Sequence, residues 1–425
     1  MKTAAIIAEY NPFHNGHAYQ LEEVRKTSGA DFLIILMSGD FVQRGTPAIF
    51  DKYVRTQAAL SGGADLVLEL PLAFATGSAP RFAEGAVSIL NGLGIVEELW
   101  FGSEEGSMER FDLLAEILIN EPEEYREYLK DFLRKGLSYP AARSKALTEF
   151  CSLENRQDAK DNTSTSSLED FLKEPNNILG LEYILALKKH NSSIKPRTLQ
   201  RTGSGYHAEE LEGNFSSATA IRSSIMEGGI QSIASSVPEN CYYLYEETAS
   251  KGLYVMPDQL SEALRYQLWK EPKESLCRIL DINEELANRI LNLRPEFKGF
   301  EAFAELLQTR NQTKTGMQRA LLHILLGVTW EDAQIPFSNM YPMNEENKPS
   351  QRLVRMLGLS EHARKGKLLS SVAKDSPVAL TANPGTHPLK DQYEKDLMAS
   401  QYYEALRIKG TQERFVPEFS RKLII

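Results

Sequence analysis

The 425-residue sequence has few cysteines and lacks any long apolar run. Its three cysteines, Cys151, Cys241 and Cys277, lie far apart and match no metal-ligand spacing, which excludes a disulfide framework and favours a reducing compartment. No stretch approaches the roughly 18 apolar residues that span a bilayer. The start at Met1 to Thr3 leads into a strand-length apolar run and not a signal sequence. We therefore expect a soluble, cytoplasmic protein with no membrane partner.

Several common motifs are also missing. The sequence has no G-x-x-x-x-G-K-[ST] and no G-x-G-x-x-G, and Gly203-Ser204-Gly205 is only a short turn. These absences disfavour a Walker-type NTPase and a dinucleotide oxidoreductase. There is no His-Glu-x-x-His and no cluster of cysteine and histidine, so we expect no metal site formed by the chain itself.

Charge is distributed unevenly along the chain. The net charge of -10 taken alone argues against a nucleic-acid partner, but it hides a difference between the two halves. Residues 1–250 carry 23 basic and 36 acidic side chains, whereas residues 251–425 carry 25 and 22. Between Gln351 and Lys374, six basic residues accompany a single acidic one, Glu361. The six are Arg352, Arg355, Arg364, Lys365, Lys367 and Lys374. This run is a candidate surface for an RNA backbone, although from the charges alone a solvated helix face is the better explanation.

The first twenty residues carry the most specific signal. The apolar run Ala4–Ala8 predicts a buried strand, and the tetrapeptide His14-Asn15-Gly16-His17 follows it at the expected start of a helix. A helix N-terminus offers unpaired backbone N–H groups and a positive dipole end, and two imidazoles add hydrogen-bond donors for a phosphoryl oxygen. The segment therefore predicts an ATP site.

A second candidate phosphate element lies 200 residues further on. Phe215–Arg222 reads Phe-Ser-Ser-Ala-Thr-Ala-Ile-Arg, in which Ser216 or Ser217 can cap a helix. Capping and phosphate binding are compatible, because hydroxyls and amides at a helix start also bind phosphate.

Strand-like and helical segments alternate in the first half. Candidate strands are Ala4–Ala8, Phe32–Met37, Asp65–Leu70, Glu98–Phe101 and Arg197–Gln200. Candidate helices are Ala18–Lys26, Lys52–Ser61 and Arg81–Leu90, with Gly29, Gly62 and Gly92 as their stops. This alternation predicts an α/β fold with a Rossmann-like, doubly wound parallel sheet, whose ligands bind at the carboxyl ends of the strands.

The second half lacks this alternation and reads as mainly helical. Examples are Leu260–Trp269, Glu284–Leu293, Phe303–Leu307 and Arg319–Leu326. The polar segment Asp158–Ser167 is expected to be a surface loop, and Ile335–Ser350, with its prolines and asparagines, an irregular connection. We expect two domains, a catalytic one at residues 1–231 and a mainly helical one at residues 232–425.

The two motifs resemble those of a known superfamily. His14–His17 is similar to the HIGH motif of nucleotidyltransferases and class I aminoacyl-tRNA synthetases, and Phe215–Arg222 is similar to their ISSTxxR element. Ile7–His17, Met37–Gly45, Pro175–Gly180 and Arg201–His207 together resemble the bacterial tRNA(Met) cytidine acetate ligase family.

The resemblance implies a reaction and its partners. Members of this family use ATP to convert acetate to acetyladenylate, release pyrophosphate, and acetylate N4 of the wobble cytidine (position 34) of elongator tRNA(Met), which gives N4-acetylcytidine. We accordingly expect ATP as co-substrate, Mg²⁺ with it, acetate and elongator tRNA(Met) as partners, no DNA, and a tRNA-binding role for residues 232–425.

The resemblance also implies roles for individual residues. His14, His17 and Arg222 are the expected catalytic residues, at the reacting α-phosphorus and at the departing pyrophosphate. The expected ATP contacts are Ile7, Ala8, Glu9, Tyr10, Asn11, Pro12, Phe13, His14, Asn15, Gly16, His17, Ala18, Tyr19, Gln20, Gly102, Asn176, Arg201, Ser217 and Thr219. Asp40, Gln43 and Arg44 are expected near acetate or the incoming cytidine. From sequence alone, Gly102 is equally well explained as a strand-end turn.

Two other function classes remain open. A small-molecule adenylyltransferase would use the same ATP site on a phosphate-bearing cofactor precursor, although it rarely needs nearly 200 additional residues with a basic bias. A catalytically silent nucleotide-binding module is disfavoured because both histidines and the Ser/Thr/Arg motif are intact.

Overall fold

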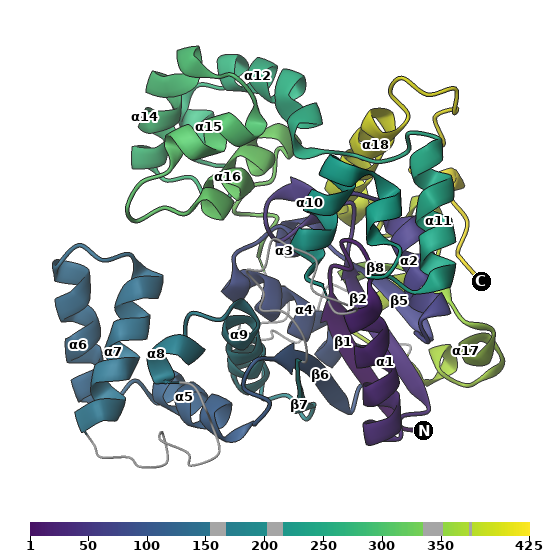
Figure 1. Cartoon of the computed structure of the whole chain (residues 1–425). Coiled ribbons are helices and arrows are strands. Elements are labelled where there is room, and N and C mark those ends of the chain that lie inside the picture. Colours follow the sequence, from purple (N-terminus) through teal and green to yellow (C-terminus); the bar gives the residue numbers. More distant parts are fainter. Residues whose placement is uncertain (154–166, 202–215, 335–351, 374–375) are drawn as a thin grey trace.

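The fold is built on one mostly parallel sheet. The computed structural model describes residues 1–153, 167–201, 216–334, 352–373 and 376–425. Several predicted segments lie outside these residues. They are the irregular connection Ile335–Ser350, most of the loop Asp158–Ser167, residues 202–207 of the motif segment Arg201–His207, Phe215 at the start of the second phosphate element, and Lys374. The sheet has seven strands in the order β7-β6-β1-β2-β5-β8-β9 (Figure 1).

The five predicted strands are confirmed as the parallel part of this sheet. They are β1 (Thr3–Ala8), β2 (Phe32–Ser38), β5 (Leu66–Leu70), β6 (Glu98–Ser103) and β7 (Lys195–Gln200). The hairpin strands β3 (Phe41–Val42) and β4 (Thr46–Pro47) form a separate antiparallel pair directly after β2.

Two strands from the end of the chain complete the sheet, and the sequence did not predict them. The strand β8 (Arg352–Leu359) pairs antiparallel with β5, and β9 (Val378–Thr381) pairs parallel with β8. Both expected parts of the chain, residues 1–231 and 232–425, therefore contribute strands to the same sheet.

The predicted helices in the first half are present. They are α1 (Asn15–Ser28), α2 (Lys52–Ser61) and α4 (Ala79–Leu93). Gly29 and Gly62 cap α1 and α2, but Gly92 lies inside α4, which ends at Gly94 with a φ of 68°. The other helices up to residue 250 are α3 (Leu72–Ala75), α5 (Glu109–Asn120), α6 (Glu123–Arg134), α7 (Tyr139–Leu153), α8 (Leu168–Phe171), α9 (Pro175–Lys189), α10 (Ala218–Gly228) and α11 (Glu239–Ser250).

The predominance of helices in the second half is confirmed. The helices α12 (Ser261–Lys270), α14 (Glu284–Leu293), α15 (Phe300–Leu307) and α16 (Lys314–Leu326) form a lobe of their own, which Figure 1 shows above the sheet. The short helix α13 (Lys273–Leu276) belongs to the same segment. After β8 come α17 (Glu361–Lys365) and the long α18 (Glu394–Arg407), and the 3₁₀-helix η8 (Glu418–Ser420) lies near the C-terminus.

The core lies on both faces of the sheet, as strand β2 illustrates. Its residues Phe32, Ile34 and Leu36 belong to the cluster under α4 and α9, whereas Leu33, Ile35 and Met37 belong to the cluster under α1, α2 and α11. All six side chains are at most 5% exposed. A strand buried on both faces is typical of a doubly wound parallel sheet, so the fold prediction is confirmed.

The lobe α12–α16 has its own apolar core, which includes Leu264, Leu321 and Phe303. This core extends to Phe41 and Leu72 of the first half of the chain and to Tyr403 of α18. Among the helices that the structure describes, none is long and apolar enough to cross a membrane.

Candidate functional site

A cavity of about 160 Å³ lies at the carboxyl ends of β1, β6 and β7, where the doubly wound fold places its ligands. It is lined by the turn after β1, the start of α1, the β3–β4 hairpin, and residues of α4, α9 and α10. Its lining residues are Ile7, Ala8, Glu9, Tyr10, Asn11, His14, His17, Gln20, Gln43, Arg44, Phe82, Phe101, Gly102, Asn176, Leu179, Tyr183, Arg201, Ser217, Ala218, Thr219 and Arg222.

A buried arginine holds the turn after β1 in place. Arg55, which is 0% exposed, donates to the carbonyl oxygen of Glu9 at 2.7 Å, to that of Ser38 at 3.0 Å, and to that of Gly39. These carbonyls lie at the ends of β1 and β2, so one guanidinium fixes the spacing between the two adjacent loops. In the same turn Tyr10 has a φ of 49°, in the left-handed region that non-glycine residues rarely adopt.

The two histidines of the tetrapeptide cap helix α1. His14 is the N-cap residue, and its Nδ1 accepts from the backbone N–H of Gly16 at 3.1 Å. The Nδ1 of His17 accepts from the backbone N–H of His14 at 3.3 Å, and the two rings stack with centroids 3.7 Å apart. Because each Nδ1 accepts a hydrogen bond, a neutral ring carries its proton on Nε2, which makes Nε2–H the donor left for a ligand.

Both rings are neutral at physiological pH. Burial, and then the charges of Arg201 and Arg222, lower the pKa of His14 to about 3. Burial, and then His14 and Arg201, lower the pKa of His17 well below its usual range. The positive charge in the cavity therefore comes from its arginines, while the imidazoles contribute directed N–H groups.

A second helix N-terminus faces the same cavity. Ser217 is the N-cap of α10, and its hydroxyl accepts from the backbone N–H of Ala220 at 3.1 Å. Arg222 donates to Thr219 Oγ1 at 3.2 Å and to the carbonyl oxygen of Asn11 at 2.7 Å. The last bond ties α10 to the turn after β1, across 211 positions of sequence. Two helix N-termini thus converge where an anion would bind.

The opposite wall is formed by β6, α9 and the end of β7. A Cβ atom on Gly102 would lie 3.3 Å from Cγ of Arg201, so a side chain here would crowd that arginine. Asn176 donates to Glu104 Oε1 at 2.6 Å, which orients its amide at the start of α9. Phe82, Phe101, Leu179 and Tyr183 add an apolar surface.

Most of the predicted site residues come together in this cavity. Those that do not line it are Pro12, Phe13, Asn15, Gly16, Ala18, Tyr19 and Asp40. Phe13 is 0% exposed and part of the core, where its carbonyl oxygen accepts from the hydroxyl of Tyr245 at 3.0 Å. Asn15 donates to the carbonyl oxygen of Ser235 at 2.9 Å. These residues shape the turn and the helix start that present their neighbours.

Asp40 differs from its two predicted companions. Gln43 and Arg44 line the cavity, but Asp40 points into a buried ionic cluster, where its Oδ1 accepts from the backbone N–H of Lys52 at 2.9 Å. Burial raises the pKa of Asp40 to about 6, against the opposing charge of Lys52. Asp40 was expected beside acetate or the incoming cytidine together with Gln43 and Arg44, but it lies outside the cavity lining and pairs with the buried Lys52.

The apolar wall was missed because its members look like ordinary core residues. One signal was available: Asn176, Leu179 and Tyr183 have the spacing i, i+3 and i+7, which places them on one face of α9. Recognising that a helix begins at Pro175 would have linked the two apolar residues to the predicted Asn176.

The basic run Gln351–Lys374 does not form one exposed surface. Arg355 is 2% exposed and paired with Glu418, and the guanidinium of Arg352 lies 5.0 Å from the ring centroid of Phe74. Arg364, Lys365 and Lys367 are exposed. Arg355 is therefore too deeply buried to contribute to the expected RNA surface, and Arg352 is only half-exposed.

Comparisons with known proteins find relatives along almost the whole chain. The family model described as HIGH Nucleotidyl Transferase matches residues 1–415. A tRNA(Met) cytidine acetate ligase of Acetivibrio thermocellus is 38% identical over 437 residues, covering 100% of both chains. One of Halothermothrix orenii is 37% identical over 388 residues, covering 91% of this chain and 88% of the relative.

Solved structures give the same result. The crystal structure of Thermotoga maritima TmcAL without ligand superposes with a TM-score of 0.86 at 29% identity, covering 99% of this chain and 97% of that one. The structure of the same protein bound with alpha-thio ATP superposes with a TM-score of 0.83 at 28% identity, with the same coverage.

Proposed function

Because this chain belongs to the HIGH nucleotidyltransferase family and, within it, to the tRNA(Met) cytidine acetate ligases, we propose that it acetylates elongator tRNA(Met). In this proposal the enzyme uses ATP to activate acetate and transfers the acetyl group to N4 of the wobble cytidine. The observation that carries it is the convergence of two helix N-termini, two neutral histidines and the side chains of Arg201 and Arg222 in one cavity.

The first step is phosphoryl chemistry that needs little covalent help from the protein. An oxygen of acetate attacks the α-phosphorus of ATP, the bond to the β-phosphate oxygen breaks, and pyrophosphate leaves. Nε2–H of His14 and of His17 stabilises the charge that develops on the α-phosphate oxygens. Ser217, Thr219 and Arg222, at the start of α10, hold the departing pyrophosphate.

The second step transfers the acetyl group. N4 of cytosine attacks the acetyl carbonyl, the bond to the phosphate oxygen breaks, AMP leaves, and N4 loses a proton. Gln43 and Arg44 are the polar residues of the hairpin that lines the cavity, and we assign them to acetate and the incoming cytidine. Gly102 and Asn176, beside the apolar wall, are assigned to the adenosine end, where aromatic and aliphatic side chains suit a base.

Mg²⁺ would enter with the nucleotide. Glu9 is the single carboxylate among the described residues that line the cavity, and no group of three or more metal-ligating side chains occurs in the described part of the chain. That donor set fits an ion held mainly by phosphate oxygens, which is how proteins commonly bind Mg²⁺. When bound, the ion neutralises phosphate charge.

For the tRNA, the helical lobe offers an exposed aromatic and basic surface. On α12, Tyr266 is 67% exposed and Trp269 56% exposed, and the guanidinium of Arg294 lies 4.5 Å from the ring centroid of Trp269. Arg265 and Lys270 are exposed on the same helix. Exposed rings flanked by cations suit unstacked bases and a phosphate backbone, as in a tRNA loop. This surface supports a tRNA-binding role for the second half of the chain, and a tRNA substrate is consistent with the expected cytoplasmic location.

The test is pyrophosphate exchange. Purified protein should incorporate labelled pyrophosphate into ATP only when acetate is present, because exchange requires reversal of acetyladenylate formation. His17→Ala should reduce the exchange rate at least about 100-fold, since it removes a donor from the transition state. His362→Ala is the matched control, because His362 is exposed and lies outside the cavity.

Two outcomes would contradict the proposal. Exchange that does not depend on acetate would favour the small-molecule adenylyltransferase. Equal losses in the two histidine variants would remove the assigned role of the tetrapeptide. Circular dichroism on both variants establishes that the fold survives.

A further inference from the structure

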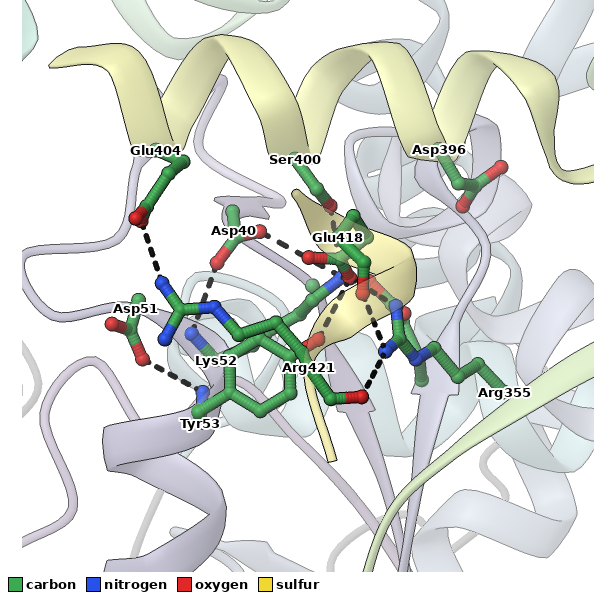
Figure 2. A network of polar contacts seen from close by, with 12 residues as sticks. Asp40, Asp51, Lys52, Tyr53, Arg355, Asp396, Ser400, Glu404, Glu418 and Arg421 are labelled. Carbon is green, nitrogen blue, oxygen red and sulfur yellow. Dashed lines mark hydrogen bonds and ion pairs between the residues drawn. The ribbon is translucent and has the colours of Figure 1, made fainter. Parts of the chain in front are cut away.

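A fully buried lysine joins the catalytic part of the chain to its C-terminal segment. Lys52, at the start of α2, is 0% exposed. Its Nζ lies 2.6 Å from Glu69 Oε1, 2.5 Å from Glu418 Oε1 and 3.7 Å from Asp40 Oδ2. It also donates to Ser400 Oγ at 2.8 Å. Figure 2 shows Lys52, Asp40 and Glu418 beneath α18, with Ser400 projecting from that helix toward them.

Further polar groups pair with the charges of this cluster. Arg355 of β8 pairs with Glu418 and donates to its carbonyl oxygen at 3.1 Å. The hydroxyl of Tyr53 donates to Glu418 Oε1 at 2.9 Å, and that of Tyr393 donates to Glu69 Oε2 at 2.7 Å. Two cations thus face three carboxylates, and a buried cluster of this kind is strongly destabilised when one member is removed.

The cluster leads directly to the β3–β4 hairpin. Asp40 accepts from the backbone N–H of Lys52 through its side chain, and its carbonyl oxygen accepts from Ala48 N–H at 2.9 Å. Tyr403 of α18 packs against Phe41 with ring centroids 6.0 Å apart, and its hydroxyl donates to the carbonyl oxygen of Ala48 at 2.8 Å. The base of the hairpin is therefore held from α18 as well as from α2.

The tip of the same hairpin faces the cavity. Gln43 and Arg44 line it, and the backbone N–H of Gln43 donates to Glu9 Oε1 at 2.9 Å. The elements that we assign to the triphosphate, the starts of α1 and α10, make none of the cluster contacts just described. The cluster therefore contacts the hairpin directly, whereas it reaches the start of α1 only through α2 and through the hairpin's bond to Glu9.

We propose that Lys52, Glu418 and Tyr403 are positioning residues for acetate activation. Through the buried cluster, the C-terminal segment 394–425 fixes the β3–β4 hairpin so that Gln43 and Arg44 meet acetate in a reactive geometry. This inference rests on the proposed function, because it names the part of that reaction which the cluster serves. It predicts that disturbing the cluster weakens the use of acetate far more than the binding of ATP.

The experiment compares two buried carboxylates that each pair with an arginine. Glu418→Gln removes the negative charge that Lys52 and Arg355 share. The matched control is Asp65→Asn. Asp65 lies at the amino end of β5, whereas Glu69 of the cluster lies toward the other end of that strand. Its Oδ2 pairs with Arg25 at 2.6 Å. We expect Glu418→Gln to raise the acetate KM in pyrophosphate exchange at least about 10-fold and the ATP Kd less than about 3-fold. Asp65→Asn should change neither.

Two further measurements keep the proposal open to refutation. Tyr403→Phe removes one hydrogen bond to the hairpin and keeps the ring, so it should fold and raise the acetate KM about 3-fold. Hydrogen exchange should show the Gly45 amide, which donates to the Val42 carbonyl oxygen at 2.8 Å, opening faster in Glu418→Gln while the Ala18 amide of α1 is unchanged. Equal acetate KM values in Glu418→Gln and Asp65→Asn, or unaltered exchange at Gly45, would overturn the proposal. If pyrophosphate exchange by the wild-type protein did not depend on acetate, the proposed function would be contradicted instead. Hydrogen exchange at the Gly45 amide would still test whether the buried cluster holds the hairpin in place.

Discussion

Gly45 is the point at which the cavity-lining hairpin meets the helical lobe, and its replacement by alanine tests that contact. Gly45 has a φ of 77°, and a Cβ atom there would lie 2.3 Å from the backbone nitrogen of Arg319 and 2.6 Å from its Cα. Ordinary contact begins at 3.4 Å, so the hairpin and α16 must separate by about 1 Å. The obstacle is helix backbone, which cannot rotate out of the way.

The magnitude has two parts. The left-handed backbone costs an alanine about 1 kcal/mol, and forcing extra volume into a packed contact costs about 1–3 kcal/mol more. Gly29→Ala is the control, because Gly29 has a similar φ of 62° and a Cβ atom placed there would have no other atom within 4 Å. We expect Gly29→Ala to lower the free energy of unfolding by about 1 kcal/mol, and Gly45→Ala by about 2–4 kcal/mol.

The functional effect should separate the two variants more clearly. A displacement of about 1 Å at a reacting group can cost about 100-fold in rate, so acetate-dependent exchange should fall roughly 10- to 100-fold in Gly45→Ala. Gly29→Ala should retain wild-type exchange. Urea denaturation measures stability and pyrophosphate exchange measures activity. If the two variants lose equal stability and equal activity, the tight contact between the hairpin and α16 has no role in shaping the cavity.

Three further predictions concern binding, pH and RNA. Arg222→Lys keeps the charge but loses the paired donors to Asn11 and Thr219, so the ATP Kd measured by calorimetry should rise about 10-fold, and an unchanged Kd would contradict the assignment to pyrophosphate. Burial lowers the pKa of His323 to about 4. Between pH 7 and pH 5 the imidazole is therefore protonated in the unfolded chain but not in the folded one. Acidification over this interval should lower the free energy of unfolding by about 2 kcal/mol through His323 alone. When the pH falls from 7 to 5, urea denaturation should show that His323→Gln loses about 2 kcal/mol less free energy of unfolding than the wild type does. Equal losses in the two proteins would refute the role of His323 in this pH dependence. Trp269→Ala should weaken tRNA binding about 10-fold by filter assay while acetate-dependent exchange stays normal, and loss of exchange would place Trp269 in a different role.

The parallel sheet and the loops that follow its strands could be predicted from local sequence, whereas Gly102, Asn176 and Arg201 were named through the family resemblance. The run Phe32–Met37 is apolar at every position, which identifies a strand covered on both faces. The loop that contains Gln43 and Arg44 follows this strand directly in the chain. These two residues could therefore be placed at the carboxyl ends of the parallel strands without knowledge of any distant contact. The tetrapeptide at His14–His17 likewise defines a strand, a turn and a helix start within the first twenty residues.

The features that were missed depend on distant partners. The strand β8 contains Arg352 and Arg355, and charged residues inside a strand make it read as a surface segment. Arg355 is buried only because Glu418, 63 positions later, neutralises it. Asp40 was assigned to substrate for a similar reason, since its partner Lys52 is itself buried by residues near the C-terminus.

The most direct test of the proposed reaction is to follow the acetyl group itself. The protein is incubated with ATP, labelled acetate and bulk tRNA, the tRNA is digested to nucleosides, and labelled nucleosides are identified by mass spectrometry. We expect label in N4-acetylcytidine of elongator tRNA(Met), only in the presence of ATP and with release of AMP and pyrophosphate. Absence of labelled N4-acetylcytidine, or labelling that does not require ATP, would contradict the account.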